Sequence, residues 1–227
     1  MSPRAFQQVD VFTATPYLGN PVAVVLDGSG LSTEQMQGFT KWTNLSEATF
    51  LLPPKDPRAD YSVRIFTTSQ ELPFAGHPTL GSCHAWLQAG GRPKAEHIVQ
   101  ECGVGLVKIR RDGERLAFAA PPLRRSGPLD ESDLALIARG LGIARGDIVD
   151  HAWCDNGPGW RGVMLRSAEQ VLALKPDGAV LAGLFVGVAG PHGKVGVVAP
   201  RPAQDDCAFG VRAFFPPNNG MAEDPVT

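Results

Sequence analysis

The sequence predicts an α/β protein made of two related halves. Segments with strand character alternate with helical segments, and the same signals recur in the same order in both halves. A linker-like stretch, Pro121-Pro122 with Ser126-Gly127-Pro128, separates the halves. We therefore predict an N-terminal lobe of residues 1–122 and a C-terminal lobe of residues 123–227. With 43% hydrophobic residues, a chain of 227 residues is long enough for two modest cores.

The first half contains clear strand and helix signals. Alternating apolar residues bounded by turn residues predict strands at residues 9–12, 22–26, 49–52, 61–66, 98–100, 105–110 and 115–119. We expect helices at residues 33–43 and 77–87. Ser32 lies directly before the first helix, and Gln35 lies three residues after Ser32, which is the spacing of a capping box. His77-Pro78-Thr79 opens the second helix, and Gly90-Gly91 ends it.

The second half repeats these signals. The matched segments are 19–21 with 156–158, 32–35 with 167–170, 50–53 with 195–200, 63–66 with 211–214, and 76–79 with 223–227. Two unrelated α/β segments are the alternative, but five matches in one order favour a repeat. The apolar run from Gly178 to Gly190 has 13 residues and four glycines, which is too short to span a bilayer. We predict a buried, glycine-rich strand pair there.

Composition argues against several classes of protein. The net charge of −2 comes without a basic stripe, so we expect no nucleic-acid partner. The N-terminus has no apolar signal region, and we expect a soluble, cytoplasmic protein with no membrane partner. The four cysteines lie far apart without a CxxC motif, so we expect reduced thiols and neither a zinc site nor a disulfide framework.

Glu47 is the first candidate for chemistry. It lies at a helix-to-strand corner, directly before a buried strand. Partial loss of solvent there would raise the proton affinity of its carboxylate toward the range useful for general acid–base catalysis. A solvated loop glutamate is the alternative interpretation.

His77 and Asp224 occupy matching places in the two halves. His77 follows Gly76 at the start of a helix, where backbone N–H groups and the helix dipole favour an anion such as a substrate carboxylate. A structural capping histidine is the alternative. Because matching helix starts tend to face each other in a repeat protein, we predict one cleft that contains Glu47, His77 and Asp224.

These residues lie in segments that resemble the phenazine-biosynthesis PhzF family. The resemblance covers the whole chain, and the segments around Glu47 and His77 are long enough to be specific. The segments that carry it are Asp10–Thr13 (DVFT), Gly19–Pro21 (GNP), Asn44–Phe50 (NLSEATF), Glu71–Gly81 (ELPFAGHPTLG) and Glu223–Thr227 (EDPVT).

The resemblance implies an α+β, diaminopimelate epimerase-like fold. Such a fold has two pseudo-symmetric lobes, each a mixed sheet curled around a central helix, usually in a homodimer. It further implies a cofactor-independent, metal-free isomerase that acts by proton transfer on a small carboxylate-bearing ring or enol compound. By resemblance, Glu47 carries the proton, while His77 and Asp224 orient the ligand and assist. The pocket would be lined by Asn20, Ser46 and Gly76. No cysteine stands at the positions that the fold's two-thiol epimerases use.

The sequence departs from the family pattern at its end. In the family, the segment that matches Asp224 continues into a helix whose N-terminal amides hold the substrate carboxylate, whereas this sequence ends at Thr227. We therefore expect an incomplete second lobe that lacks its central helix. Two alternatives for function stay open: an inactive paralogue that binds a small molecule or a protein, and a lyase or hydrolase that uses the same residues.

Overall fold

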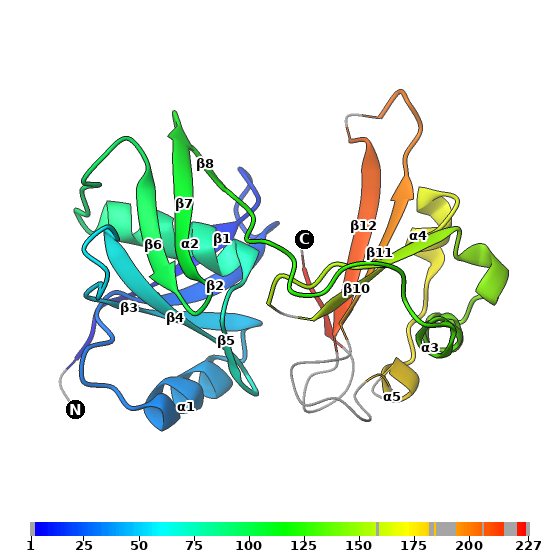
Figure 1. The fold of residues 1–227 in the computed structure, drawn as a ribbon, viewed down its shortest axis with the longest axis horizontal. Helices are drawn as coiled ribbons and strands as arrows, with labels where there is room; N and C mark the ends of the chain where they lie inside the picture. The colour runs from blue at the N-terminus through cyan, green and yellow to red at the C-terminus, as the bar shows by residue number, and fades with distance from the viewer. Residues whose placement is uncertain are drawn as a thin grey trace. The chain divides into compact units, whose positions relative to one another are not determined.

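The computed structural model describes residues 3–157, 159–181, 184, 194–205, 207–215 and 222–225. The chain divides into two compact units, Met1–Pro122 and Leu123–Thr227 (Figure 1). Each unit has its own sheet and its own hydrophobic core. Within the described residues, no helix has both the length and the apolar character needed to cross a bilayer.

The first unit is built on an eight-stranded mixed sheet. Along the sheet the strands follow the order β1-β2-β3-β4-β6-β7-β8, and β5 pairs with β4. The pairs β2–β3 and β4–β6 are parallel, and the other pairs are antiparallel. The strands are β1 (Phe6–Val11), β2 (Asn20–Val25), β3 (Glu47–Leu52), β4 (Tyr61–Thr67), β5 (Glu71–Leu72), β6 (Ile98–Cys102), β7 (Gly105–Asp112) and β8 (Arg115–Phe118).

Two helices pack on opposite faces of this sheet. The helix α2 (Gly76–Gln88) contacts β1, β2, β3 and also β8, the strand at the far end of the path, so the sheet curls around it (Figure 1). The helix α1 (Thr33–Thr43) contacts β3 and β4 from outside. α1 begins with the predicted capping box, since the Ser32 hydroxyl accepts from the Gln35 N–H and the Gln35 side chain accepts from the Ser32 N–H. The predicted central helix of the first lobe is therefore α2.

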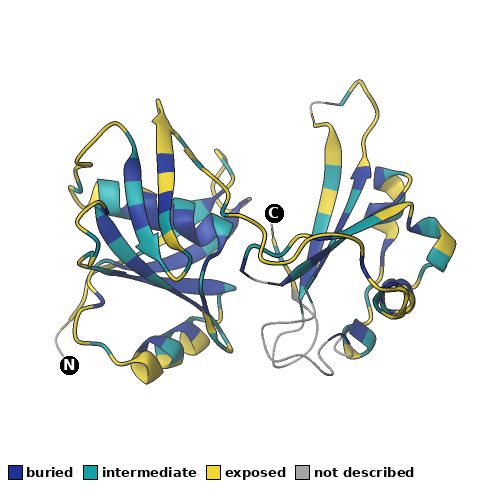
Figure 2. Cartoon of the chain, in the orientation of Figure 1, coloured by how far each residue is buried: buried dark blue, intermediate teal, exposed yellow. Residues whose placement is uncertain are grey.

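The sequence of β2 reflects burial on both of its faces. Val22 and Val24 point into the cluster around α2, while Ala23 and Val25 point into a second cluster beneath α1. A strand covered on both sides has a continuous apolar sequence instead of an alternating one. Figure 2 shows α2 mostly buried, whereas α1 is exposed along its outer face.

The second unit contains a five-stranded sheet in the order β13-β12-β11-β10-β9. β10 and β11 are parallel, and their outer neighbours are antiparallel, as for β1 to β4 in the first unit. This shared pattern agrees with two pseudo-symmetric lobes. The elements are α3 (Glu131–Leu141), η1 (Arg145–Asp147), β9 (Asp150–Trp153), β10 (Trp160–Met164), α4 (Ala168–Ala173), α5 (Gly178–Leu181), β11 (Lys194–Pro200), β12 (Phe209–Phe215) and β13 (Ala222–Glu223).

The core of the second unit lies between one face of this sheet and its helices. Leu134 and Leu141 of α3 and Leu181 of α5 belong to one buried cluster with Val195 and Val197 of β11. On the other face, Phe209 is 53% exposed and Val211 is 47% exposed.

A buried ion pair borders this core. The Arg161 side chain donates to Asp133 Oδ2 over 2.8 Å, and only 4% of that arginine side chain is exposed. Trp153 carries the guanidinium groups of both Arg125 and Arg161 over its ring, at 3.6 Å and 4.3 Å from the ring centre. The first of these arginines belongs to the segment that enters the unit, so the ring joins that segment to the core.

The predicted glycine-rich strand pair differs from the structure. Residues Gly178–Leu181 form the short helix α5 and not part of a strand pair. Asp177 Oδ1 accepts the backbone N–H groups of Ala179 and Val180, which is how a side chain caps a helix start. Most of the rest of the predicted pair lies outside the described residues.

Candidate active site

Glu47 is the first residue of β3, and the register of the sheet turns its side chain toward α2. It pairs with Val22 across the parallel ladder and with Thr67 across the antiparallel one. Successive side chains of a strand point to opposite faces, so Glu47 lies on the same face as Thr49, whose hydroxyl accepts from Ser82 of α2. The Glu47 residue is only 7% exposed. The alternative of a solvated loop glutamate is therefore wrong.

His77 is the second residue of α2 and is also only 7% exposed. The residue before this helix, Ala75, has no side-chain cap, and the first turn carries no acidic side chain. The partial positive charge at the helix start is therefore not neutralised by a residue of the helix itself. An anion beside this helix start is electrostatically favoured.

The structure brings Glu47 and His77 together. Oε2 of Glu47 lies 3.4 Å from Nε2 of His77, and both side chains are more than nine-tenths buried. A carboxylate and an imidazole at this distance in a low-dielectric setting interact more strongly than they would in water. Each group can accept and release a proton, so the pair has the parts that proton transfer needs.

The predicted lining residues of the first unit lie around this pair. Asn20 opens β2, is 1% exposed and lies on the same sheet face as Val22. Ser46 directly precedes Glu47 and is half-buried. At Gly76, a Cβ atom would lie 3.3 Å from the ring of Phe118 in β8, so a small residue is favoured where the helix approaches that ring.

Asp224 belongs to the second unit. It directly follows β13, its backbone N–H donates to the Ala213 carbonyl over 2.9 Å, and its side chain is half-buried. Glu47 and Asp224 lie in different units, and a contribution of both to one cleft stays a prediction.

Sequence reasoning missed one aromatic neighbour of this site. The ring of Phe12 lies 6.4 Å from the imidazole ring of His77, centre to centre, in an edge-on arrangement with an interplanar angle of 61°. Phe12 was predicted as the last residue of a strand, yet β1 ends at Val11 because Phe12 adopts a φ of 67°. Alternation alone carries no signal for such a turn.

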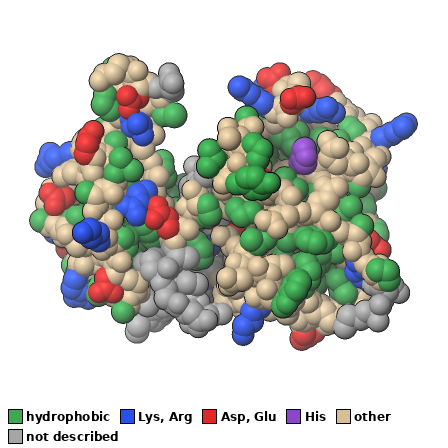
Figure 3. All heavy atoms as spheres, turned by 180° about the vertical axis from the view of Figure 1, so that it is seen from behind, with side chains coloured by type: hydrophobic (Ala, Val, Ile, Leu, Met, Phe, Trp, Pro, Cys, Tyr) green, Lys and Arg blue, Asp and Glu red, His purple; other side chains and the backbone are tan. Residues whose placement is uncertain are grey.

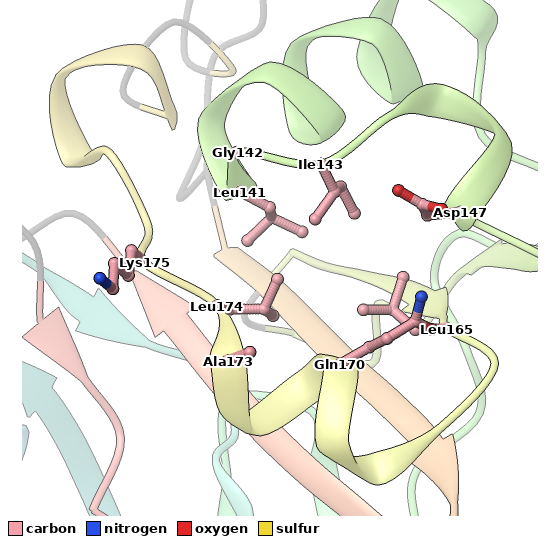
Figure 4. Close-up of a pocket in the computed structure, with 9 residues that line it drawn as sticks. All are labelled: Leu141, Gly142, Ile143, Asp147, Leu165, Gln170, Ala173, Leu174 and Lys175. Carbon is pink, nitrogen blue, oxygen red and sulfur yellow. The ribbon is translucent and has the colours of Figure 1, made fainter.

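A separate pocket of about 300 Å³ lies within the second unit (Figure 4). Leu141, Ile143, Leu165 and Leu174 form much of its wall. Its polar groups serve the local backbone: Asp147 Oδ2 accepts from the Ala144 N–H, and Gln170 Oε1 accepts from the Arg166 N–H. None of the predicted site residues lines it.

Within the described part of the chain, no three His, Cys, Asp or Glu side chains come together as metal ligands. Absence of a metal remains a prediction, which activity lost to a chelator and restored by a divalent ion would contradict.

The face drawn in Figure 3 shows charged side chains of both signs scattered among hydrophobic ones.

Comparison with known proteins relates the whole chain to one family. A family model described as phenazine biosynthesis-like protein, PhzC-PhzF, matches residues 9–227. The chain is 40% identical over 185 residues to "Antisense-enhancing sequence 1" of Schizosaccharomyces pombe, covering 78% of this chain and 62% of that protein. It is 36% identical over 174 residues to trans-2,3-dihydro-3-hydroxyanthranilate isomerase of Pseudomonas aeruginosa, covering 74% of this chain and 60% of that enzyme.

These matches span a little under two thirds of each relative's length. The crystal structure of a PhzF-family phenazine biosynthesis protein from Bacillus anthracis matches with a TM-score of 0.77 and 23% identity, covering all of this chain and 77% of that one. This likeness confirms the predicted α+β, diaminopimelate epimerase-like fold. The match along residues 9–227 shows that the chain belongs to the phenazine biosynthesis-like PhzC-PhzF family.

Proposed function

We propose that this protein is a cofactor-independent isomerase that moves a proton between two carbon atoms of a small carboxylate-bearing ring or enol compound. The observation that carries the proposal is the buried contact between Glu47 and His77, 3.4 Å apart. The family supports it, because a relative with 36% identity is named as an isomerase of trans-2,3-dihydro-3-hydroxyanthranilate. The reaction needs no oxidant or reductant, since one proton leaves a carbon atom and one returns.

Glu47 is the proton carrier in this proposal. Its carboxylate takes a proton from one carbon of the substrate, and the resulting acid returns it to another carbon. His77 donates a hydrogen bond to the carboxylate or to the substrate while charge develops, and the α2 N-terminus attracts the substrate carboxylate. Asp224 assists from the second unit. Asn20, Ser46 and Gly76 line the pocket.

Replacement of the carboxylate tests the role of Glu47. In Glu47→Gln, fold and ligand affinity should stay nearly unchanged, while turnover falls about 10²–10⁴-fold, the usual contribution of a positioned general base. NMR in D₂O should show deuterium entering trans-2,3-dihydro-3-hydroxyanthranilate with the wild type and not with Glu47→Gln. Glu114→Gln is the matched control, because Glu114 is an exposed glutamate of the same unit. Undiminished exchange in Glu47→Gln would remove Glu47 from the mechanism.

The same experiment separates the isomerase from a non-catalytic binding protein. Binding of the compound without any deuterium exchange over a long incubation would favour the binding protein.

We also propose the homodimer that is usual in the family, and light scattering would then report twice the 24.1 kDa of one chain.

A further inference from the structure

Phe12 is placed at the edge of the Glu47–His77 pair at a conformational cost. Its φ of 67° lies in the left-handed region, where a bulky side chain is strained. Its ring remains 49% exposed, so burial in the core does not explain the conformation. This backbone conformation places the Phe12 ring in edge-on contact with the His77 ring.

The surrounding loop holds Phe12 in this state. Oδ2 of Asp10 accepts the Tyr17 N–H over 2.7 Å, which ties the far end of the loop back to β1. The Thr13 hydroxyl accepts the Thr15 N–H over 2.9 Å and closes a turn directly after Phe12. A side chain at Gly19 would collide with the Val11 carbonyl and with Thr13, so only glycine lets the loop close this tightly.

Phe6, at the other end of β1, provides a natural comparison. It is also half-exposed, at 51%, and its ring makes an edge-on contact with Phe39 of α1 at 6.0 Å. The two phenylalanines therefore have similar exposure and similar aromatic contacts. They differ in that Phe12 is strained and contacts His77 of the candidate site, whereas the ring of Phe6 contacts Phe39 of α1.

We infer that Phe12 is a positioning and specificity-determining residue. Its ring edge fixes the orientation of the His77 imidazole and keeps water from the Glu47–His77 pair. Its exposed half forms a flat apolar wall against which an unsaturated ring packs, so the site selects cyclic over acyclic carboxylates. This inference rests on the proposed function.

The first test reads the effect on His77 without any substrate. Phe12→Leu removes the ring current but keeps an apolar side chain, so the NMR signals of the His77 ring should shift, and Phe12→Tyr should restore them. Phe6→Ala should leave those signals in place. Unmoved His77 signals in Phe12→Leu would overturn the positioning role, whatever reaction the protein catalyses.

The second test reads selectivity, with trans-2,3-dihydro-3-hydroxyanthranilate as the ring compound and crotonate as the acyclic one. Phe12→Leu should weaken binding of the ring compound roughly 5-fold or more, as expected for loss of packing against an aromatic ring, and leave crotonate unchanged. The binding is measured in the Glu47→Gln background, so that turnover does not interfere. Equal weakening of both compounds would refute selection by ring packing.

The third test separates function from stability. Phe12→Gly relieves the strained φ, so its unfolding midpoint should stay close to that of the wild type while selectivity is lost. A fall as large as that of Phe50→Ala, which removes a fully buried ring, would mean that Phe12 serves only the core. Failure of the proposed isomerase reaction is read separately, as the absence of turnover by the wild type.

Discussion

Two glycine-to-alanine substitutions within the first unit should change its stability in opposite directions. Gly38 lies inside α1, is exposed, and has nothing within 4 Å of the position of an added methyl group. Gly81 lies inside α2, against β1 and β2. A methyl group there would lie 3.1 Å from Cγ2 of Val11 and closer still to Cγ1 of Val22. Helix propensity favours both substitutions equally, so packing decides the difference.

The magnitudes follow from these contacts. Alanine is favoured over glycine in a helix interior by about 1 kcal/mol, so Gly38→Ala should stabilise the unit by roughly that amount. The contacts at Gly81 lie well inside the roughly 3.5–4.0 Å at which carbon atoms attract. Val22 is fully buried and stiff about χ1, which puts the overpacking cost near the upper end of about 1–3 kcal/mol. Gly81→Ala should therefore destabilise by about 2 kcal/mol after the gain in propensity is subtracted.

Hydrogen exchange at the amides of β2 measures the free energy of opening for the first unit alone, which matters because a chain with two units need not unfold in one step. The two variants should differ by about 3 kcal/mol, with the wild type between them. Gly81→Ala should also disturb the His77 ring signals, because α2 carries both residues. If Gly81→Ala proved as stable as Gly38→Ala, the account of α2 packed tightly on β2 would be wrong.

Three further predictions concern groups outside the site. Burial raises the pKa of Cys83 to about 12, so at pH 8 iodoacetamide should label exposed Cys154 quickly and Cys83 only after unfolding, as peptide mass spectrometry will show. Asp133→Asn should cost about 3 kcal/mol in urea unfolding, and more than Arg161→Met, because the arginine is the more buried partner and would be left without its counter-charge. The Arg58 guanidinium donates a hydrogen bond that lowers the pKa of Asp56 from 3.8 to about 2. The stabilisation that this bond gives the protein is therefore present above pH 4 and lost as pH falls toward 2. Asp56→Asn should make the free energy of unfolding depend less on pH in that range.

Local signals in the sequence predicted most of the first unit. The capping box at Ser32 and the opening of α2 at His77 both depend on residues close together in the chain, and both are confirmed. The helix α3 was missed, although Leu134, Ile137, Ala138 and Leu141 show helical spacing and are all buried. The internal repeat gives no signal for α3, because the first half has no helix at the matching place.

Other features depend on the tertiary structure and left no local signal. A short apolar run such as Gly178–Leu181 fits a strand or a helix, and only the cap from Asp177 distinguishes them. Glu47 and His77 were each predicted as functional from their local context. Their distance of 3.4 Å follows from the register of β3 and from the packing of α2, which no spacing in the sequence gives. The position of the Phe12 ring follows from a loop that closes through hydrogen bonds of Asp10 and Thr13, and strand alternation gives no sign of this closure.

The parallel pairing of β2 with β3 also affects how the protein folds. Asn20, Glu47 and His77 come from three segments far apart in the sequence, and parallel neighbours cannot be joined by a hairpin. The chain must therefore pay the entropy of closing long loops before any contact of the site forms. Local helices such as α1 can form early, whereas the contact between Glu47 and His77 requires most of the first sheet. In a refolding chain, circular dichroism should recover before the site does, so the contact between Glu47 and His77 is the last feature that the first unit regains.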